Sequence, residues 1–115
     1  MKVWASADAT WFHPPGHYGE LQVSNVVDWA TGRNVQVQCS QLPPGSGKEL
    51  HTHEDAAQLY VVLAGEFRFD TGAEPLRLQP LQAVLFEPGD PHAICNDGTE
   101  PGTVLVTTIR YGPAA

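Results

Sequence analysis

The chain has 115 residues, of which 42% are hydrophobic, and a formal net charge of −7 from thirteen acidic and six basic side chains. This length suits one domain with a hydrophobic core of its own. The six cations are scattered and form no basic stripe to replace phosphate counterions, so we expect neither nucleic acid nor an anionic membrane surface as a partner. No apolar run is long enough to span a bilayer.

The N-terminal segment lacks the long apolar stretch of a signal peptide, so we expect a cytoplasmic protein. In that compartment Cys39 and Cys95 are expected to be reduced thiols rather than a disulfide. We predict a single domain over residues 1–115, with an N-terminal arm over residues 1–20 and a barrel over residues 21–111.

The arm ends in a segment, residues 11–20, that is too rich in proline and glycine for regular structure and is expected to wrap the sheet. His13 and His17 flank its Pro-Pro-Gly turn. Exposure is the simpler expectation for both histidines, although an arm that reaches over the barrel would bring one of them to a site.

After residue 20, short β-favouring runs alternate with glycine and proline, and no amphipathic helical periodicity is present. Valine, isoleucine, threonine and aromatic residues dominate the runs that we predict as strands. These are residues 21–28, 34–42, 58–63, 66–70, 76–79, 83–86, 92–96 and 103–111, with hairpin turns at 30–33 and 70–73. Many short strands with such turns predict an all-β sandwich or small barrel.

The run from Val35 to Cys39 alternates strictly, with Gln36 and Gln38 on one face. Two interpretations remain open for these glutamines. They belong to a strand face in contact with solvent, or they line a polar cavity and bind substrate.

His51 and His53 are separated by one residue, so in an extended chain their side chains lie on the same face. His92 lies in another predicted strand. Three neutral imidazoles on converging strands suit a first-row transition metal and leave room for water or substrate. The alternative is a metal-free site in which the histidines serve as hydrogen-bonding or acid–base groups.

The spacing of Gly45, His51, His53, Gln58 and Gly65 resembles the first sequence motif of the cupins, which are small double-stranded β-helix (jelly-roll) barrels. The resemblance implies an all-β cupin barrel with an N-terminal arm. It also implies one divalent transition metal, such as Ni, Zn, Fe, Mn or Co, held by His51, His53, Gln58 and His92.

The second cupin motif is matched in part, by Gly89, His92 and Asn96. Its proline is displaced by one position, to Pro88, and Leu81 stands where a glycine is usual. The two motifs together span residues 45–96, just under half of the chain.

Gln58 departs from the glutamate that is usual in the first motif. Because an amide is neutral, a divalent ion bound by three imidazoles and Gln58 keeps its full double charge. Such an ion is a stronger Lewis acid and attracts carboxylates and enolates. Its higher charge also disfavours its oxidation, which makes chemistry of Fe(II) with oxygen less favourable. In the alternative, Gln58 turns away and only forms a hydrogen bond beside a three-histidine site.

The ligand set with glutamine is similar to that of the KdgF-type cupins, which act on unsaturated uronates and convert the cyclic sugar toward its linear ketone. Those proteins carry an aspartate, an aromatic residue and an arginine on the C-terminal strand. The comparable residues 106–110 include Arg110 but neither the aspartate, where Thr107 stands, nor the aromatic residue.

Tyr60 and Arg110 are the candidate catalytic residues. Tyr60 shares a strand face with Gln58 and is suited to donate a proton or a hydrogen bond, unless it only packs in the core. Arg110 is suited to clamp a substrate carboxylate, or else it forms a surface ion pair.

The favoured function is a metal-dependent cupin enzyme in which the metal acts as a Lewis acid on a small carbonyl, carboxylate or enol substrate. Isomerisation, ring opening, elimination and cyclisation are the reactions considered. The alternatives are a three-histidine iron dioxygenase and a non-catalytic cupin that binds a small ligand. Trp4 and Trp11 in the arm, together with the cupin resemblance, predict a homodimer.

Overall fold

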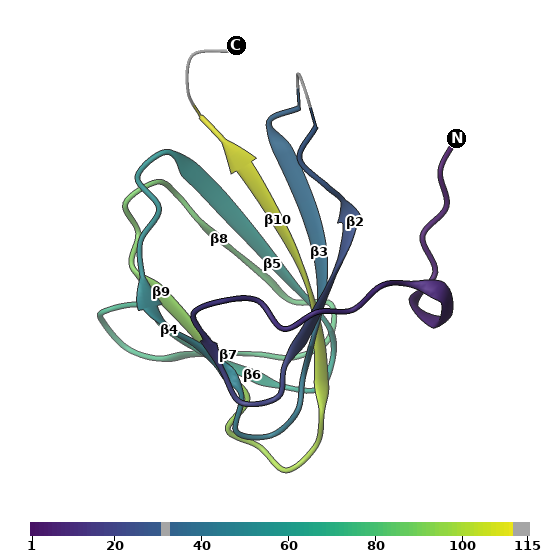
Figure 1. The fold of residues 1–115 in the computed structure, drawn as a ribbon. Coiled ribbons are helices and arrows are strands. Elements are labelled where there is room, and N and C mark those ends of the chain that lie inside the picture. The colour runs from purple at the N-terminus through teal and green to yellow at the C-terminus, as the bar shows by residue number, and fades with distance from the viewer. Residues whose placement is uncertain (31–32, 112–115) are drawn as a thin grey trace.

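In the part of the chain that the structure describes, short β-favouring runs separated by turns fold into ten strands, which form two five-stranded antiparallel sheets facing each other (Figure 1). The computed structural model describes residues 1–30 and 33–111. The first sheet, in spatial order, contains β1 (His17–Tyr18), β4 (Gly47–His51), β9 (His92–Cys95), β6 (Phe67–Asp70) and β7 (Leu76–Leu78). The second contains β2 (Gln22–Val27), β3 (Val35–Leu42), β10 (Gly102–Arg110), β5 (Ala56–Ala64) and β8 (Ala83–Phe86). The predicted all-β class is confirmed.

Each of the eight predicted runs overlaps a strand, but β1 and β4 were not predicted. The β4 segment reads Gly-Lys-Glu-Leu-His and has no β-branched residue, so local preference does not indicate a strand there. Its backbone is extended because it pairs with β9 on one side and β1 on the other. The turn predicted at 70–73 lies in the connection between the antiparallel strands β6 and β7, whereas residues 31–32 of the other turn lie outside the described residues.

The pairing of β10 decides which side chains of the second sheet face the interior. Val106 is opposite Gln38 on β3 and Tyr60 on β5, and all three line an internal cavity. Because side chains alternate along a strand, the next residue, Thr107, is opposite Val37 and Leu59 on the outer face. The register therefore places alternate residues of β3, β5 and β10 at the site.

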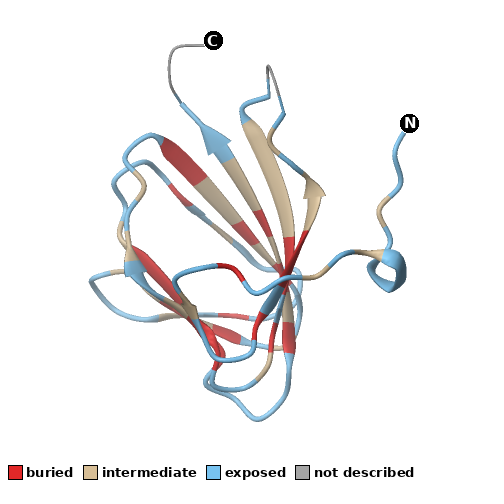
Figure 2. Ribbon diagram, viewed as in Figure 1, coloured by how far each residue is buried: buried red, intermediate tan, exposed pale blue. Residues whose placement is uncertain are grey.

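The hydrophobic core lies between the two sheets, where buried residues of opposing strands meet (Figure 2). Val62, Phe67 and Phe69 have no exposed surface. Gly65, the last glycine of the first motif, has a φ of +79°, and a Cβ built on it would lie 2.8 Å from the Cα of Gly102. The tight turn after β5 therefore needs glycine both for its backbone conformation and for the close approach of β10.

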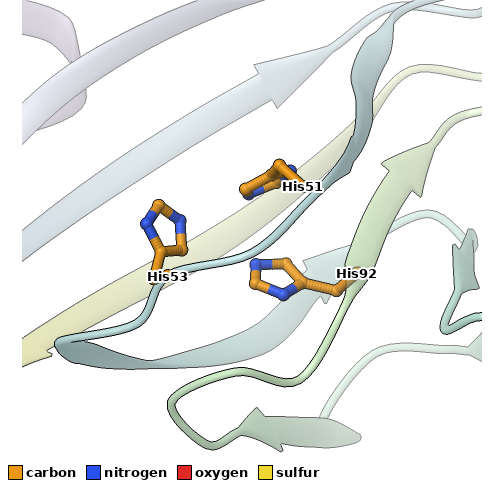
Figure 3. A group of neighbouring side chains, drawn as sticks. All are labelled: His51, His53 and His92. Atoms are coloured by element: carbon orange, nitrogen blue, oxygen red, sulfur yellow. The ribbon is translucent and has the colours of Figure 1, made fainter.

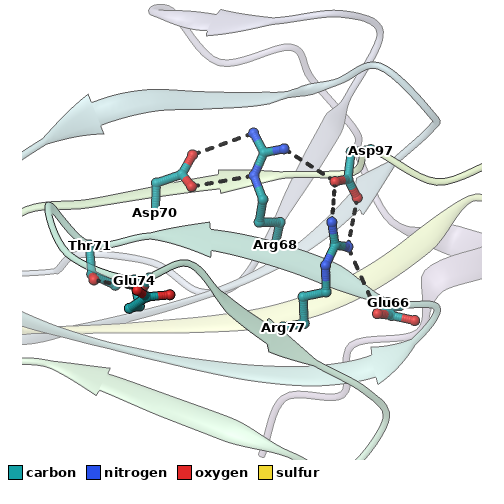
Figure 4. Close-up of polar contacts among 7 residues, drawn as sticks. All are labelled: Glu66, Arg68, Asp70, Thr71, Glu74, Arg77 and Asp97. Carbon is teal, nitrogen blue, oxygen red and sulfur yellow. Dashed lines mark hydrogen bonds and ion pairs between the residues drawn. The ribbon is translucent and has the colours of Figure 1, made fainter.

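The two sheets present different outer faces. On the first sheet, Asp97 accepts hydrogen bonds from Arg68 on β6 and from Arg77 on β7, the shortest at 2.7 Å (Figure 4). On the second sheet, Leu63 and Leu85 are 45% and 48% exposed. The first sheet thus carries an exposed ion-pair cluster, which contributes little to stability, and the second has large apolar side chains at its surface.

The N-terminal arm runs out from the barrel and includes one turn of 3-10 helix, η1 (Ser6–Asp8; Figure 1). Trp4 donates a hydrogen bond to Ser24 and meets Trp11 edge to face at 6.1 Å between ring centroids. Nearer the barrel, the arm adds β1 to the first sheet. These contacts involve one chain only, so the homodimer stays a prediction.

Both cysteines are free thiols, as predicted. Cys39 is buried on β3, whereas Cys95 is half-buried on β9 in the other sheet. Within the described residues, no helix has the length and apolar character needed to cross a membrane.

Leu81 has a positive φ of +67°, at the third position of a turn closed by a hydrogen bond from the Gln82 amide to the Gln79 carbonyl. With Pro80 before it, this is the position where a type II turn favours glycine. The side chain is 88% exposed. We expect Leu81→Gly to raise the free energy of unfolding by about 0.5–1 kcal/mol, because the Cβ strain is removed and little packing is lost.

Chemical denaturation of the purified variant checks this expectation. Leu81→Ala is the matched control, since it removes the exposed side chain but keeps the Cβ and should give no such gain. A glycine variant less stable than the wild type would show that backbone strain at Leu81 is not the dominant effect.

Candidate metal centre

The cavity between the two sheets has a volume of about 320 Å³ and is lined by residues of both sheets and of the arm. The apolar residues of the lining, which come from both sheets and from the arm region, are Leu21, Val23, Leu42, Ile94, Val104 and Val106. His17, Lys48, His51, His53, Gln58 and Tyr60 are among the polar residues of the lining. This volume lies in the range of small-molecule sites, at its lower end.

The structure brings the three predicted histidine ligands together (Figure 3). His51 ends β4, His53 follows in the loop, and His92 begins β9 directly opposite His51. One nitrogen from each ring lies within 4.8 Å of one nitrogen from each of the others. The two histidines do not come from one continuous strand, because β4 ends at His51 and the loop that follows positions His53.

Backbone carbonyls hold two of the imidazoles in the tautomer that a metal requires. His51 Nδ1 lies 2.8 Å from the carbonyl oxygen of Glu49, and His92 Nδ1 lies 2.9 Å from that of Asp90. A carbonyl can only accept, so in each ring Nδ1 carries the hydrogen and Nε2 presents a lone pair. His53 Nε2 is buried and has no hydrogen-bond partner among the described residues.

The histidines favour the neutral state in which imidazole binds metals. Burial is the main cause that lowers the pKa of His51 to about 4; the Glu49 carbonyl opposes this shift, and the positive charges that His92 and His53 would carry add to it. Burial also lowers the pKa of His92. At neutral pH these rings therefore present lone pairs rather than positive charges.

Gln58 faces the histidines from β5, on the opposite sheet. Its side-chain oxygen lies 2.8 Å from His92 Nε2 and accepts a hydrogen bond from the Tyr60 hydroxyl at 3.1 Å. Its amide nitrogen donates to Thr108 Oγ1 at 3.0 Å, and Thr108 is the residue opposite Gln58 on β10. Gln58 therefore points into the site, with its oxygen beside the imidazoles.

The contact between Gln58 and His92 brings together two atoms that both present lone pairs, since Nδ1 carries the hydrogen of His92. The 2.8 Å separation therefore suits two donors that share a cation. The bonds of Gln58 to Tyr60 and Thr108 keep its oxygen, rather than its nitrogen, directed at His92.

Two aromatic side chains pack against the His92 ring and orient it. Phe86 stacks on the imidazole with 4.4 Å between centroids and 8° between planes, and Tyr60 meets it edge to face at 5.9 Å. Burial raises the pKa of Tyr60, so its hydroxyl keeps its proton. The unpaired nitrogen of His53, the lone pairs of His51 and His92, and the Gln58 oxygen make a donor set that fits a divalent transition metal.

Of the other predicted site residues, Gln38 belongs to the cavity lining, whereas Gln36 and Arg110 do not. Gln38 lines the cavity and donates to Asn25 at 2.9 Å, whereas Gln36 donates to Asp28 and is not part of the lining. Arg110 is exposed and lies over the Trp29 ring, 3.7 Å from its centroid. This guanidinium therefore packs on an indole and is not part of the cavity lining, where a clamp for a substrate carboxylate would lie.

Lys48 and Thr108 are the site residues that sequence reasoning missed. Simple alternation along β4 from His51 would place Lys48 on the outer face of the sheet. The register of β4 against β9 shifts between Lys48 and His51, however, so Lys48 is opposite Ile94 and faces inward. Only the pairing of the strands could have indicated either residue. His17 reaches the cavity because the arm crosses the barrel, which was one of the two alternatives for the arm histidines.

Residues 39–108 match the Cupin domain family. Among curated proteins, the chain is 33% identical over 85 residues to the oxalate-binding protein of Thermotoga maritima, covering 72% of this chain and 70% of that protein. It is also 29% identical over 90 residues to the mannose-1-phosphate guanylyltransferase RfbM of Salmonella typhimurium. That match covers 78% of this chain but only 17% of the length of the transferase.

Solved structures share the same fold. A predicted oxalate decarboxylase from Thermotoga maritima superposes with a TM-score of 0.86 at 24% identity, covering 95% of this chain and 99% of that one. KdgF from Halomonas sp. superposes with a TM-score of 0.78 at 21% identity, covering 96% of each chain. At these identities the likeness establishes the jelly-roll architecture.

Proposed function

Because the chain belongs to the cupin family, as its motifs predicted, we propose that it binds one divalent transition metal through His51, His53, His92 and Gln58 and acts on a small anionic substrate. The observation that carries this proposal is the pair of facing lone pairs on His92 Nε2 and the Gln58 oxygen, 2.8 Å apart beside the unpaired nitrogen of His53. When bound, such a metal polarises a carbonyl, carboxylate or enol oxygen as a Lewis acid.

The protein's own groups support anion chemistry in this cavity. Lys48 is the one charged side chain in the lining, and no aspartate or glutamate of the described chain belongs to it. Gln58 is held by Thr108 and Tyr60, so its neutral oxygen is fixed beside the imidazoles. Such a site attracts an anion although the chain as a whole is strongly acidic.

Isomerisation, ring opening, elimination and cyclisation each need a group that moves a proton. Tyr60 is the candidate proton donor, because its hydroxyl is protonated, buried and directed at the site through Gln58. Thr107, at the position of the KdgF-type aspartate, lies on the outer face of the sheet and cannot serve as a base in the cavity. The uronate reaction of those cupins is therefore not proposed for this chain.

A non-catalytic binding role is the second candidate. It is favoured by the lack of a carboxylate base among the described cavity residues and by the similarity to an oxalate-binding protein. Turnover assays on carboxylate and enol substrates, followed by NMR with and without oxygen, separate the possibilities. A Lewis-acid enzyme turns over in both atmospheres, a dioxygenase only with oxygen, and a binding protein in neither.

We expect Gln58→Glu to keep the metal but to weaken the binding of a small carboxylate such as oxalate by about 10-fold or more, because the added negative charge opposes the anion at close range. Elemental analysis measures the metal, and calorimetry measures the anion affinity.

Gln41→Glu is the matched control, since it adds the same charge at an exposed position on β3. That variant should leave both quantities within about 2-fold of the wild type. Unchanged anion affinity in Gln58→Glu would show that the charge of the fourth ligand does not govern binding.

A further inference from the structure

The cavity has a second polar end besides the histidine cluster. Lys48 and His17 are paired on β4 and β1, and both line the cavity together with Pro14 of the arm. The Lys48 ammonium lies against the Pro-Pro-Gly turn, since a Cβ built on Gly16 would be 2.6 Å from Nζ. The arm and β4 thus bring a cation to the part of the cavity that the arm covers.

Lys48 has no ionic partner within the described chain, in which no carboxylate oxygen lies within 4.0 Å of its ammonium. The side chain is half-buried, and its neighbours in the cavity wall include Ile94, Leu21 and the half-buried His17. A half-buried ammonium that lines a cavity and has no ionic partner of its own is available to an anion. A ligand that enters the cavity is therefore well placed to supply that anion.

The rest of the lining is mixed. Val104, Val106 and Leu42 are apolar, whereas Gln38 and Ser40 on β3 add hydrogen-bonding groups. This surface suits a short carbon chain that carries an oxygen substituent. With a metal bound at the neutral histidines and the Lys48 ammonium in the same cavity, the lining is complementary to a molecule that has two acidic groups.

We propose that Lys48 binds the second acidic group of a small dianionic substrate whose first acidic group binds at the metal. The proposal rests on the proposed function and adds to it the substrate class and a residue that determines specificity. A monocarboxylate of the same length would lack the contact with Lys48 and would depend on the histidine site alone.

The test compares Lys48→Met with the wild type, both loaded with Zn²⁺, by titration calorimetry against malonate, succinate and glutarate. Propionate, butyrate and valerate are the monocarboxylates of matched carbon number. For at least one pair, the variant should bind the dicarboxylate roughly 10- to 100-fold more weakly, as expected for loss of a charge-assisted hydrogen bond. The affinity for the matched monocarboxylate should change by less than about 3-fold, because salt screens a charge that makes no direct contact with the ligand.

Lys2→Met removes the same charge from the exposed arm and should leave every affinity unchanged. Lys48→Arg, which keeps the charge, should retain a preference for the dicarboxylate. Thermal melts and zinc content show whether each variant is folded and loaded. If Lys48→Met does not fold, Lys48→Gln, which also removes the charge, is compared with the wild type in its place.

The possible failures are distinguishable. A wild-type protein that takes up no zinc, or that binds neither class of acid, contradicts the proposed function. If the wild type binds both classes but prefers no dicarboxylate, or if Lys48→Met weakens both classes equally or neither, only the assignment of Lys48 is overturned.

Discussion

Replacing His51 and His53 together by alanine is expected to reduce bound metal from about one ion per chain to less than roughly one tenth, since each lost imidazole removes a strong donor. The remaining donors would be His92 and the neutral oxygen of Gln58, which do not define a site for a transition ion. Elemental analysis after reconstitution and dialysis measures the occupancy. The shift of the melting temperature on adding metal is a second readout, because a ligand that binds only the folded state stabilises it.

His13→Ala is the matched control for this experiment. It removes an imidazole from the arm that bonds to the Leu21 carbonyl and does not line the cavity. Its metal content should equal that of the wild type. A wild-type protein that stays metal-free after supplementation, or a double variant that retains one ion per chain, would refute the metal centre.

Asn96→Ala is expected to lower the free energy of unfolding by about 2–4 kcal/mol, because it leaves buried backbone groups without partners. The Asn96 side chain is 1% exposed and donates to the carbonyls of Leu42 and Glu100, both at 2.8 Å. Its oxygen accepts a hydrogen bond from the Gly98 amide. This one side chain therefore ties the end of β9 to the end of β3 and to the loop before β10.

Urea unfolding measures the loss, with the slope of the transition compared to confirm that both proteins unfold in the same way. Asn34→Ala, at an exposed position before β3, is the control and should stay within about 0.5 kcal/mol of the wild type. Metal content in the folded Asn96→Ala protein should be unchanged, because Asn96 contacts backbone and none of the histidines. A loss below about 1 kcal/mol would show that these hydrogen bonds are replaced by water.

Much of the site could be predicted because its residues carry their own chemical signature. The spacing of His51, His53 and His92 indicated a metal centre, and the structure brings these residues together. The neutral fourth residue, Gln58, was also visible in the sequence, and its oxygen lies beside His92. Composition and turn residues were enough for eight strands, because a short run of β-branched residues between turns has few other stable conformations.

The parts that could not be predicted depend on partners distant in sequence. Strand β4 has no local β preference and exists because β1 and β9 pair with it. The placement of Arg110 depends on Trp29, which removes the guanidinium from the cavity and leaves the proposed anion contact to Lys48.

The sequence by itself determined the all-β class, the cupin motif and the candidate metal ligands, because each follows from residue type and spacing along the chain. Only the tertiary structure decided the tautomers of His51 and His92, the direction of the Gln58 amide and the inward position of Lys48. The tautomers follow from backbone carbonyls only two residues away, whose direction depends on the path that the folded chain takes there. A hydrogen bond to a side chain on another strand and a register shift between two strands are properties of pairs of segments. Neither is encoded in the periodicity of one segment.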